Sequence, residues 1–183
     1  YSGTSRILVS NVLFQGNTSS YYRGSAGLFI GYPWGENDAP NSTDITIEKS
    51  KFLENRNSSN DQRSAGAIFI GRLKGVTISE SKFADNQGGG AGAIMFQNAP
   101  ENRIVASTFS ANKGDLAGAV YFRWRSKDNR IERSNLVGHG SLAVNADVDS
   151  QPETEEYTPF TSSGNVIDNS FIAGNNGAGD GVV

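Results

Sequence analysis

One short phrase recurs along the chain: an aromatic residue, two variable residues and an asparagine. It occurs as FQGN, FLEN, FADN and FSAN, beginning at Phe14, Phe52, Phe83 and Phe109. Self-similarity at a period of a few tens of residues is typical of repeat proteins, in which each repeat packs against its neighbours. This repetition constrains the fold more than any other feature of the sequence.

Each copy of the phrase is followed by a second recurring segment, in which small residues precede aliphatic or aromatic ones. These segments are AGLFI at 26–30, AGAIFI at 65–70, AGAIMF at 91–96 and AGAVYF at 117–122. In a weaker copy, Leu136 and His139 take the Phe and Asn positions before LAVNA at 142–146. We expect the last copy to begin at Phe171.

A third recurring segment lies directly before each aromatic residue and has the alternation of a β-strand. Apolar residues two apart, such as Ile45 and Ile47, lie on the same face of a strand. The position five before the aromatic residue is expected to point inwards, and it holds Val9, Ile47, Ile78, Ile104, Ile131 and Val166. No segment has a sustained 3.6-residue period, so we expect little or no helix.

Together the three segments predict an all-β solenoid, a parallel β-helix of about six coils that occupies residues 1–183 as one domain. The aromatic positions 14, 52, 83, 109, 136 and 171 are 38, 31, 26, 27 and 35 residues apart. The shortest intervals suit one coil, and the longer ones predict insertions at 31–44, 56–64 and 145–164, which are rich in turn-forming residues. We expect no caps, as in a piece of a longer β-helix or a subunit that stacks end to end.

Stacked coils would place equivalent residues about 4.8 Å apart. The Asn of each phrase is expected to form a polar ladder at a bend. Two inward apolar columns are expected, one of Leu28, Ile68, Ile94, Val120 and Val144, the other of Ile30, Ile70, Phe96 and Phe122. Phe29, Phe69, Met95 and Tyr121 would then point outward. We expect this row to contact another copy of the chain or another surface protein, the alternative being cover by a long loop.

The alternation of FxxN and AGA[I/V] segments resembles the chlamydial polymorphic outer-membrane proteins, in which FxxN alternates with GGA[I/L/V]. Those proteins are autotransporter adhesins whose passenger domains are right-handed β-helices. The match covers roughly residues 6–146, and this chain departs from the family in having AGA for GGA and no Cys. The resemblance implies a right-handed parallel β-helix, an adhesive role and an extracellular or cell-surface location. It offers no catalytic residues.

Composition argues against several classes of function. The net charge is −3 and the charges are scattered, whereas nucleic-acid binding needs a clustered basic face. No apolar run is long enough for a membrane-spanning helix, and a single His excludes a multi-histidine metal site. The acidic insertion lacks EF-hand spacing, so we expect a solvated loop rather than a Ca²⁺ site at Asp147, Asp149, Glu153, Glu155 and Glu156. We expect no cofactor and no metal.

The rival function is a polysaccharide-active enzyme or a carbohydrate-binding β-helix. Gly138-His139-Gly140 resembles the GHG motif of polygalacturonases, but no paired Asp for acid and base catalysis precedes it. His139 is therefore expected to replace Asn in the ladder. Arg123, Arg125 and Arg130 have no carboxylate cluster beside them in the repeat frame, so lyase chemistry is not predicted.

Aromatic turns and sequons supply the remaining candidates. Trp34 and Trp124 are candidates for stacking on sugars, with Tyr21, Tyr22 and Tyr32 also in or beside turns. Asn41 and Asn57 begin N-x-[ST] sequons in predicted loops and are candidate glycan attachment sites. The sequence favours a non-enzymatic extracellular structural or adhesive β-helix, either a surface stalk or passenger segment or a filament subunit.

Overall fold

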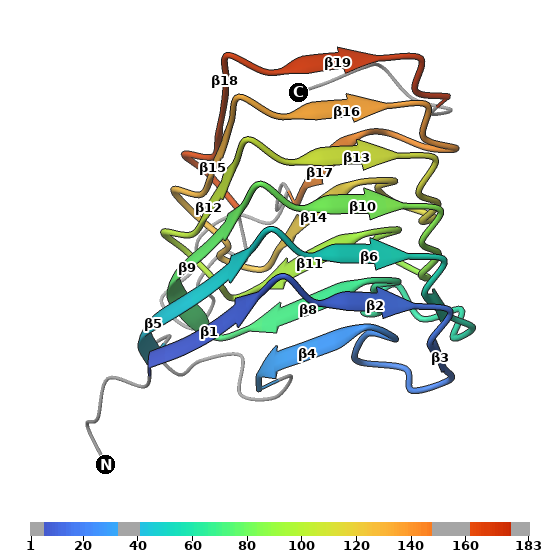
Figure 1. Ribbon diagram of the computed structural model, residues 1–183, viewed down its shortest axis with the longest axis horizontal. Helices are drawn as coiled ribbons and strands as arrows, with labels where there is room; N and C mark the ends of the chain where they lie inside the picture. Colours follow the sequence, from blue (N-terminus) through green and yellow to red (C-terminus); the bar gives the residue numbers. More distant parts are fainter. Residues whose placement is uncertain (1–5, 33–40, 148–161, 177–183) are drawn as a thin grey trace, which may run out of the picture.

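The computed structural model describes residues 6–32, 41–147 and 162–176. Every regular element in this part of the chain is a β-strand, and none is a helix, as the alternation of apolar residues predicted. The strands have two to eight residues because bends divide each repeat. The result is an all-β structure of stacked parallel sheets (Figure 1).

Three large sheets and one small sheet contain the strands, and all the pairings are parallel. Sheet 1 has the order β1 (Arg6–Ser10), β5 (Asn41–Glu48), β9 (Leu73–Ser79), β12 (Arg103–Val105), β15 (Arg130–Glu132) and β18 (Val166–Asp168). Sheet 2 has β2 (Leu13–Gln15), β6 (Lys51–Leu53), β10 (Lys82–Ala84), β13 (Thr108–Ser110), β16 (Asn135–Val137) and β19 (Phe171–Ala173). Sheet 3 has β4 (Leu28–Gly31), β8 (Ile68–Gly71), β11 (Ile94–Gln97), β14 (Val120–Arg123) and β17 (Val144–Ala146). The small sheet pairs β3 (Thr18–Ser19) with β7 (Arg56–Asn57).

The order of the strands follows the order of the sequence repeats. The chain passes from sheet 1 to sheet 2 to sheet 3 and then returns to sheet 1, beside the strand it left. Figure 1 shows sheet 2 across the front, from β2 at the bottom to β19 at the top, with sheet 3 behind it. Equivalent residues of successive repeats are therefore direct neighbours in each sheet.

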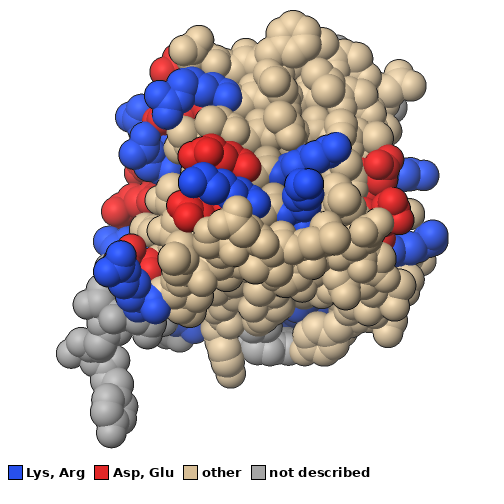
Figure 2. Space-filling view, viewed as in Figure 1, with Lys and Arg blue, Asp and Glu red and all other residues tan. Residues whose placement is uncertain are grey.

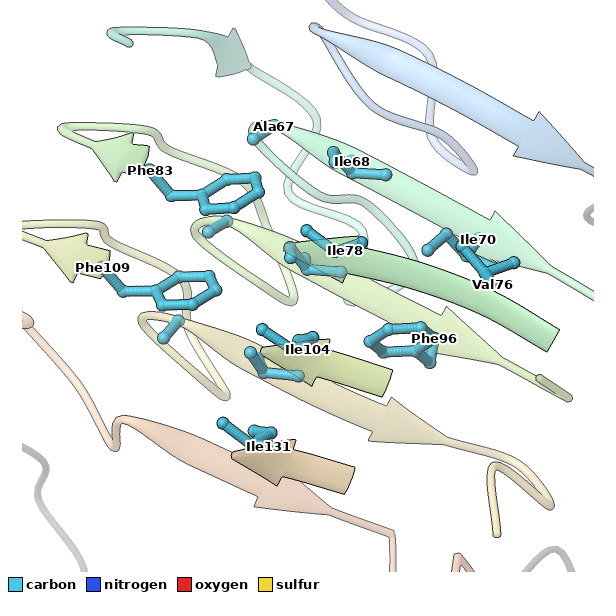
Figure 3. Packing of buried hydrophobic residues seen from close by; sticks show 14 of the residues in the cluster. Ala67, Ile68, Ile70, Val76, Ile78, Phe83, Phe96, Ile104, Phe109 and Ile131 are labelled. Carbon is cyan, nitrogen blue, oxygen red and sulfur yellow. The ribbon is translucent and has the colours of Figure 1, made fainter. Parts of the chain in front are cut away.

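The interior is filled by the apolar columns that the alternation predicted. Ile78, Ile104 and Ile131 of sheet 1 lie above one another and face the inward side chains of the other two sheets (Figure 3). The Phe rings of sheet 2 stack in parallel, with centroids 4.5 Å apart for Phe14–Phe52, 4.9 Å for Phe52–Phe83 and 4.7 Å for Phe83–Phe109. Both expected columns of sheet 3 are confirmed by its register. In-register apolar stacking thus supplies one continuous core.

The bends between sheets are made by residues with positive φ. One such residue precedes each ladder Asn or its equivalent, in the series Gly16, Glu54, Asp85, Ala111, Gly138 and Gly174. A second series lies between sheets 1 and 2, at Asn11, Lys49, Glu80, Ala106, Arg133 and Asn169. Most of these residues are not glycine, although the left-handed region costs an L-residue about 1 kcal/mol or more. The stacked geometry therefore imposes the same bend on every repeat, whatever side chain occupies it.

Two sequence-based boundaries need correction. In the last repeat, Leu136 pairs with Ile172, while Phe171 pairs with Asn135 and is 60% exposed. The frame predicted from Phe171 is therefore wrong by one residue, and by the same shift Ile167 replaces Val166 as the inward residue of β18. The correct frame is Ile172-Ala-Gly-Asn175, which preserves the spacing from the inward apolar residue to the Asn.

The predicted insertions are also shorter than expected. Residues 41–44 belong to β5, residues 56–57 form β7, and residues 145–146 end β17. Most of the insertions predicted at 31–44 and 145–164 lies outside the described residues. The turn composition misplaced these ends, because polar residues also occupy the first and last positions of the strands.

Candidate functional site

The Asn residues of the repeated phrase form a continuous hydrogen-bonded ladder, as predicted. The amide nitrogen of each side chain donates to the amide oxygen of the next, at 2.7 Å for Asn17–Asn55, 2.9 Å for Asn55–Asn86 and 2.8 Å for Asn86–Asn112. Asn86 Nδ2 also donates to the Phe52 carbonyl at 2.9 Å, and Asn86 Oδ1 accepts from Asn55 N at 3.0 Å. Each internal Asn thereby satisfies backbone groups that the bend has removed from the sheets.

His139 lies in this ladder at the place of an Asn, also as predicted. Its Nδ1 accepts from Asn112 N at 3.2 Å, and its own backbone N–H donates to Asn175 Oδ1 at 3.0 Å. The side chain is buried, and Nε2 has no hydrogen-bond partner among the described residues. Burial lowers the pKa of His139 to about 4, so the imidazole is neutral at pH 7. The position is that of a stacking residue inside the protein rather than of an accessible acid or base.

Two further ladders were missed by the sequence analysis. Ser hydroxyls accept from the backbone N–H of the preceding repeat at 3.1–3.2 Å; the residues are Ser50, Ser81, Ser107, Ser134 and Ser170. Asn102, Asn129 and Asn165 form a second Asn ladder before sheet 1, with bonds of 2.9 and 3.0 Å. The signal was present in the aligned segments, where Ser stands two before the inward aromatic or aliphatic residue in every repeat after the first, and Asn stands two before Ile104, Ile131 and Ile167.

The row of residues on the outer face of sheet 3 is mostly buried, which corrects the prediction of a partner surface. Phe29 is 41% exposed, but Phe69 and Met95 are fully buried and Tyr121 is 4% exposed. They do point away from the main core, and together with Ala65, Ala91, Ala117 and the partly buried Leu116 they form a second apolar cluster. Three of the four predicted contact residues therefore have no surface to offer a partner.

The cover over this row comes from the segments that precede the AGA strands. Gly90 lies against Met95, since a Cβ added at Gly90 would be 2.5 Å from Met95 Cε. Gly90 N donates to Ser64 O at 2.9 Å, and Leu116 N donates to Gly90 O at 3.1 Å, so the covering segments are bonded to one another. Within the described residues, the cover combines turns such as that of Gly90 with residues of the insertion predicted at 56–64, among them Ser64, so the expected alternative of cover by an insertion applies in part. The sequence analysis treated these turns as connections and so did not foresee a second layer.

A polar cluster at the end of the same outer face contains Arg123, which follows Tyr121 on β14. The Tyr121 hydroxyl donates to Asp147 Oδ1, and Trp124 N donates to Asp147 Oδ2 at 3.1 Å. Burial, assisted by Asp147, raises the pKa of Tyr121, so its phenol stays protonated and acts as a donor. Arg123 lies over the Trp124 ring, with Cζ 4.0 Å from the ring centroid. Trp124, which was predicted as a candidate for stacking on sugars, is thus in contact with the Arg123 guanidinium.

A second guanidinium lies nearby, on the turn before β8. Arg63 forms a two-point ion pair with Asp61, in which Nε donates to Asp61 Oδ1 at 2.7 Å and Nη2 contacts Asp61 Oδ2. The side-chain hydrogen bond from Arg63 lowers the pKa of Asp61, and the charge of Arg123 lowers it further. Arg63 also lies over the Tyr22 ring, 5.7 Å from its centroid. Asp61 and Asp147 therefore place carboxylates near Arg123, from predicted insertions rather than from the repeat frame in which none was expected.

The other sequence candidates do not join this cluster. Asn57 is 2% exposed and its Nδ2 donates to Tyr21 O at 3.0 Å, so the folded chain does not present it for glycan attachment. Asn41 begins β5, and its side chain lies outside the described part. Trp34 also lies outside the described residues, as do Asp149, Glu153, Glu155 and Glu156 of the acidic insertion.

Neither the distribution of surface charge nor the arrangement of possible metal ligands indicates a further site among the described residues. On the face shown in Figure 2, acidic and basic side chains are interspersed. Among the described residues, no group of three or more His, Asp or Glu side chains is placed to hold a metal ion. The part of the chain that is described contains no helix long and apolar enough to cross a membrane.

Comparisons of the chain with protein-family models, with curated proteins and with solved structures gave no match in any of the three. The function must therefore be argued from the geometry of the ladders and of the Arg123 cluster.

Proposed function

We propose that the chain is a right-handed parallel β-helix that acts as a non-enzymatic structural or adhesive element outside the cell or at its surface. The support for a β-helix is that sheets 1, 2 and 3 each receive one strand from each successive repeat, always in parallel. The right-handed sense and the surface location follow from the resemblance to the chlamydial polymorphic outer-membrane proteins. In this role the chain is a surface stalk or passenger segment, or a subunit of a filament.

The observation that carries the non-enzymatic role is the position of His139 within the Asn ladder. The GHG motif was the sharpest enzymatic signal in the sequence, and its imidazole is 1% exposed and hydrogen-bonded to Asn112. The recurring Phe, Asn and Ser residues are likewise occupied in contacts between repeats. Such contacts make a stiff rod, because each repeat is held to its neighbours by backbone and side-chain bonds together.

The surface role is tested by antibody labelling of intact source cells, with permeabilised cells as the control. We expect labelling of intact cells to equal that of permeabilised cells. Labelling that appears only after permeabilisation would contradict the surface location. Electron microscopy of the isolated material then separates the two forms, since a filament of stacked subunits would show an axial repeat of about six strand spacings, roughly 29 Å.

The rival function, a polysaccharide-active enzyme or carbohydrate-binding β-helix, is favoured by one observation. Tyr121, Arg123 and Asp147 lie together beside Trp124 on the outer face of sheet 3. Incubation of the chain with acidic polysaccharides and measurement of new reducing or unsaturated ends tests for catalysis. Depolymerisation that is lost in Arg123→Gln or Asp147→Asn but kept in His139→Asn would establish the enzyme and remove the non-enzymatic proposal.

A further inference from the structure

Arg123 makes an unusual set of contacts for a largely buried guanidinium. Its side chain is 15% exposed, yet Nη1 is 3.5 Å from Gln97 Oε1 and Nε is 4.0 Å from Asp147 Oδ2. Ordinary N–H···O bonds are 2.7–3.2 Å long, so both contacts are longer than a well-formed hydrogen bond. A guanidinium has five N–H donors in a rigid fork. The Tyr121 side chain also interacts with this guanidinium, but neither the contact with Gln97 nor the one with Asp147 lies within the range of a well-formed hydrogen bond.

The carboxylates near Arg123 are already bound by other donors. Both oxygens of Asp147 accept hydrogen bonds, from the Tyr121 hydroxyl and from Trp124 N. Asp61 is held by the side chain and the backbone N–H of Arg63. These bonds fix the two acids in place and leave Arg123 without a short ion pair to either of them. Burial is the main cause that lowers the pKa of Arg123, and the charge of Arg63 lowers it further, while the charges of Tyr121, Asp147 and Asp61 act in the opposite direction.

The cluster is also extended along the direction in which the repeats stack. Trp124 lies under Arg123 in the fourth repeat, while Arg63 and the 40% exposed Tyr22 lie lower, in the second and first repeats. Three strand spacings separate the first and fourth repeats, about 14 Å. Counting Arg23, which also lies over the Tyr22 ring, three Arg and two Asp give this row a net charge of +1. Guanidinium groups that alternate with aromatic rings suit an extended polymer that carries anionic groups and has both apolar and polar faces.

We propose that the outer face of sheet 3 around Arg123 binds an acidic polysaccharide, with a sugar carboxylate on the Arg123 guanidinium. A carboxylate matches the planar fork in a two-point contact, which a single ammonium cannot provide. A sugar ring whose carboxylate bound Arg123 would lie near the Trp124 ring, which the guanidinium already contacts. The inference rests on the proposed surface role, for which it supplies a ligand class.

The test is binding of the whole chain to sodium polygalacturonate by biolayer interferometry at physiological salt, with dextran as the neutral polymer and dextran sulfate as the sulfated one. We expect binding to polygalacturonate, weaker binding to dextran sulfate and none to dextran. Arg123→Gln is expected to weaken binding at least tenfold and Arg123→Lys at least threefold, because Lys keeps the charge but loses the fork. The matched control is Arg103→Gln, which removes the same charge from an exposed position on sheet 1.

The outcomes separate this inference from the surface role. Thermal unfolding of each variant shows whether it is folded, and Arg123→Lys keeps the test valid if Arg123→Gln is not. Equal losses in Arg103→Gln and Arg123→Gln would overturn the site, since attraction would then be general. Absence of binding to polygalacturonate, or tighter binding to dextran sulfate, would overturn the proposal that Arg123 recognises a sugar carboxylate. The surface role is decided independently, by the labelling of intact cells.

Discussion

The Asn ladder differs between its middle, at Asn86, and its upper part, at His139. Asn86 makes four side-chain hydrogen bonds, to Asn55 N, Asn55 Nδ2, the Phe52 carbonyl and Asn112 Oδ1. His139 occupies the equivalent place but uses only Nδ1 as an acceptor, and its Nε2 is unpaired among the described residues. A side-chain amide has two N–H donors and an oxygen that can accept two hydrogen bonds, whereas a neutral imidazole has only one donor and one acceptor. The comparison shows that the ladder requires only an acceptor for the backbone N–H of the preceding repeat. The additional hydrogen bonds of the side-chain amide are what strengthen it.

The largest effect is expected from removal of the middle amide. Asn86→Ala should destabilise the fold by about 4 kcal/mol, because four hydrogen bonds are lost at about 1 kcal/mol each. Chemical unfolding followed by circular dichroism measures this change. The control is Asn17→Ala at the exposed end of the ladder, where the side chain donates one bond and about 1 kcal/mol or less is expected. Equal losses in the two variants would mean that the ladder does not act as a stack.

Acidification should weaken the ladder at His139. The pKa of His139 is lowered to about 4 in the fold from the usual 6.5, so the unfolded chain binds the proton more readily between these values. The contribution of the neutral imidazole to the free energy of unfolding is present in full above pH 6.5. It falls by about 3 kcal/mol as the pH is lowered towards 4. Unfolding free energies of the native chain and of His139→Asn, measured from pH 7 to pH 4, should diverge. Parallel curves would contradict the burial of a neutral imidazole.

At pH 7 the same His139→Asn variant should be more stable than the native chain. An Asn would donate to the Phe109 carbonyl, as Asn112 donates to the Phe83 carbonyl at 3.0 Å. One added hydrogen bond is worth about 1 kcal/mol, which raises the melting temperature by about 3 °C in a chain of this size. Thermal unfolding measures the shift. A lower melting temperature would show that imidazole packing under Gly118 matters more than the amide bonds.

The smallest effect concerns the bend before the two residues. Gly138 has φ +67° and space for a Cβ, while Asp85 before Asn86 has φ 56°. Gly138→Ala should therefore cost about 1 kcal/mol or less from the backbone alone, and Asp85→Gly should be neutral or slightly stabilising. Opposite signs in unfolding experiments would confirm that the bend is the same at both steps. A loss in Asp85→Gly comparable to that in Gly138→Ala would contradict it.

The stacking frame could be predicted from the sequence because it depends on spacing within a repeat. The interval from the inward apolar residue to Asn is constant, so the columns, the Asn ladder and the place of His139 were all predicted. The last repeat failed because an aromatic residue, Phe171, was taken as the inward one, although Asn175 fixes Ile172. Local spacing therefore predicts more reliably than residue type.

The outer face of sheet 3 could not be predicted in the same way. Its cover depends on contacts between turns of successive repeats, such as Gly90 with Ser64 and Leu116. The Arg123 cluster combines β14 with Asp61 and Asp147, which lie in two predicted insertions. Because turns and insertions differ in length and sequence, no repeat frame aligns these residues before the chain is folded. Sequence periodicity finds the interior columns but not a site assembled from variable segments.

The in-register stack has a consequence for how such a chain can change over evolutionary time. Successive ladder residues are 38, 31, 26, 27 and 36 positions apart, yet each meets its neighbour through a similar hydrogen bond. Residues inserted between successive ladder positions therefore leave the stacking of the ladder unchanged. Segments at the surface are free to diversify, as antigenic or ligand-selecting regions do, while mutation of the frame itself is penalised at every level of the stack.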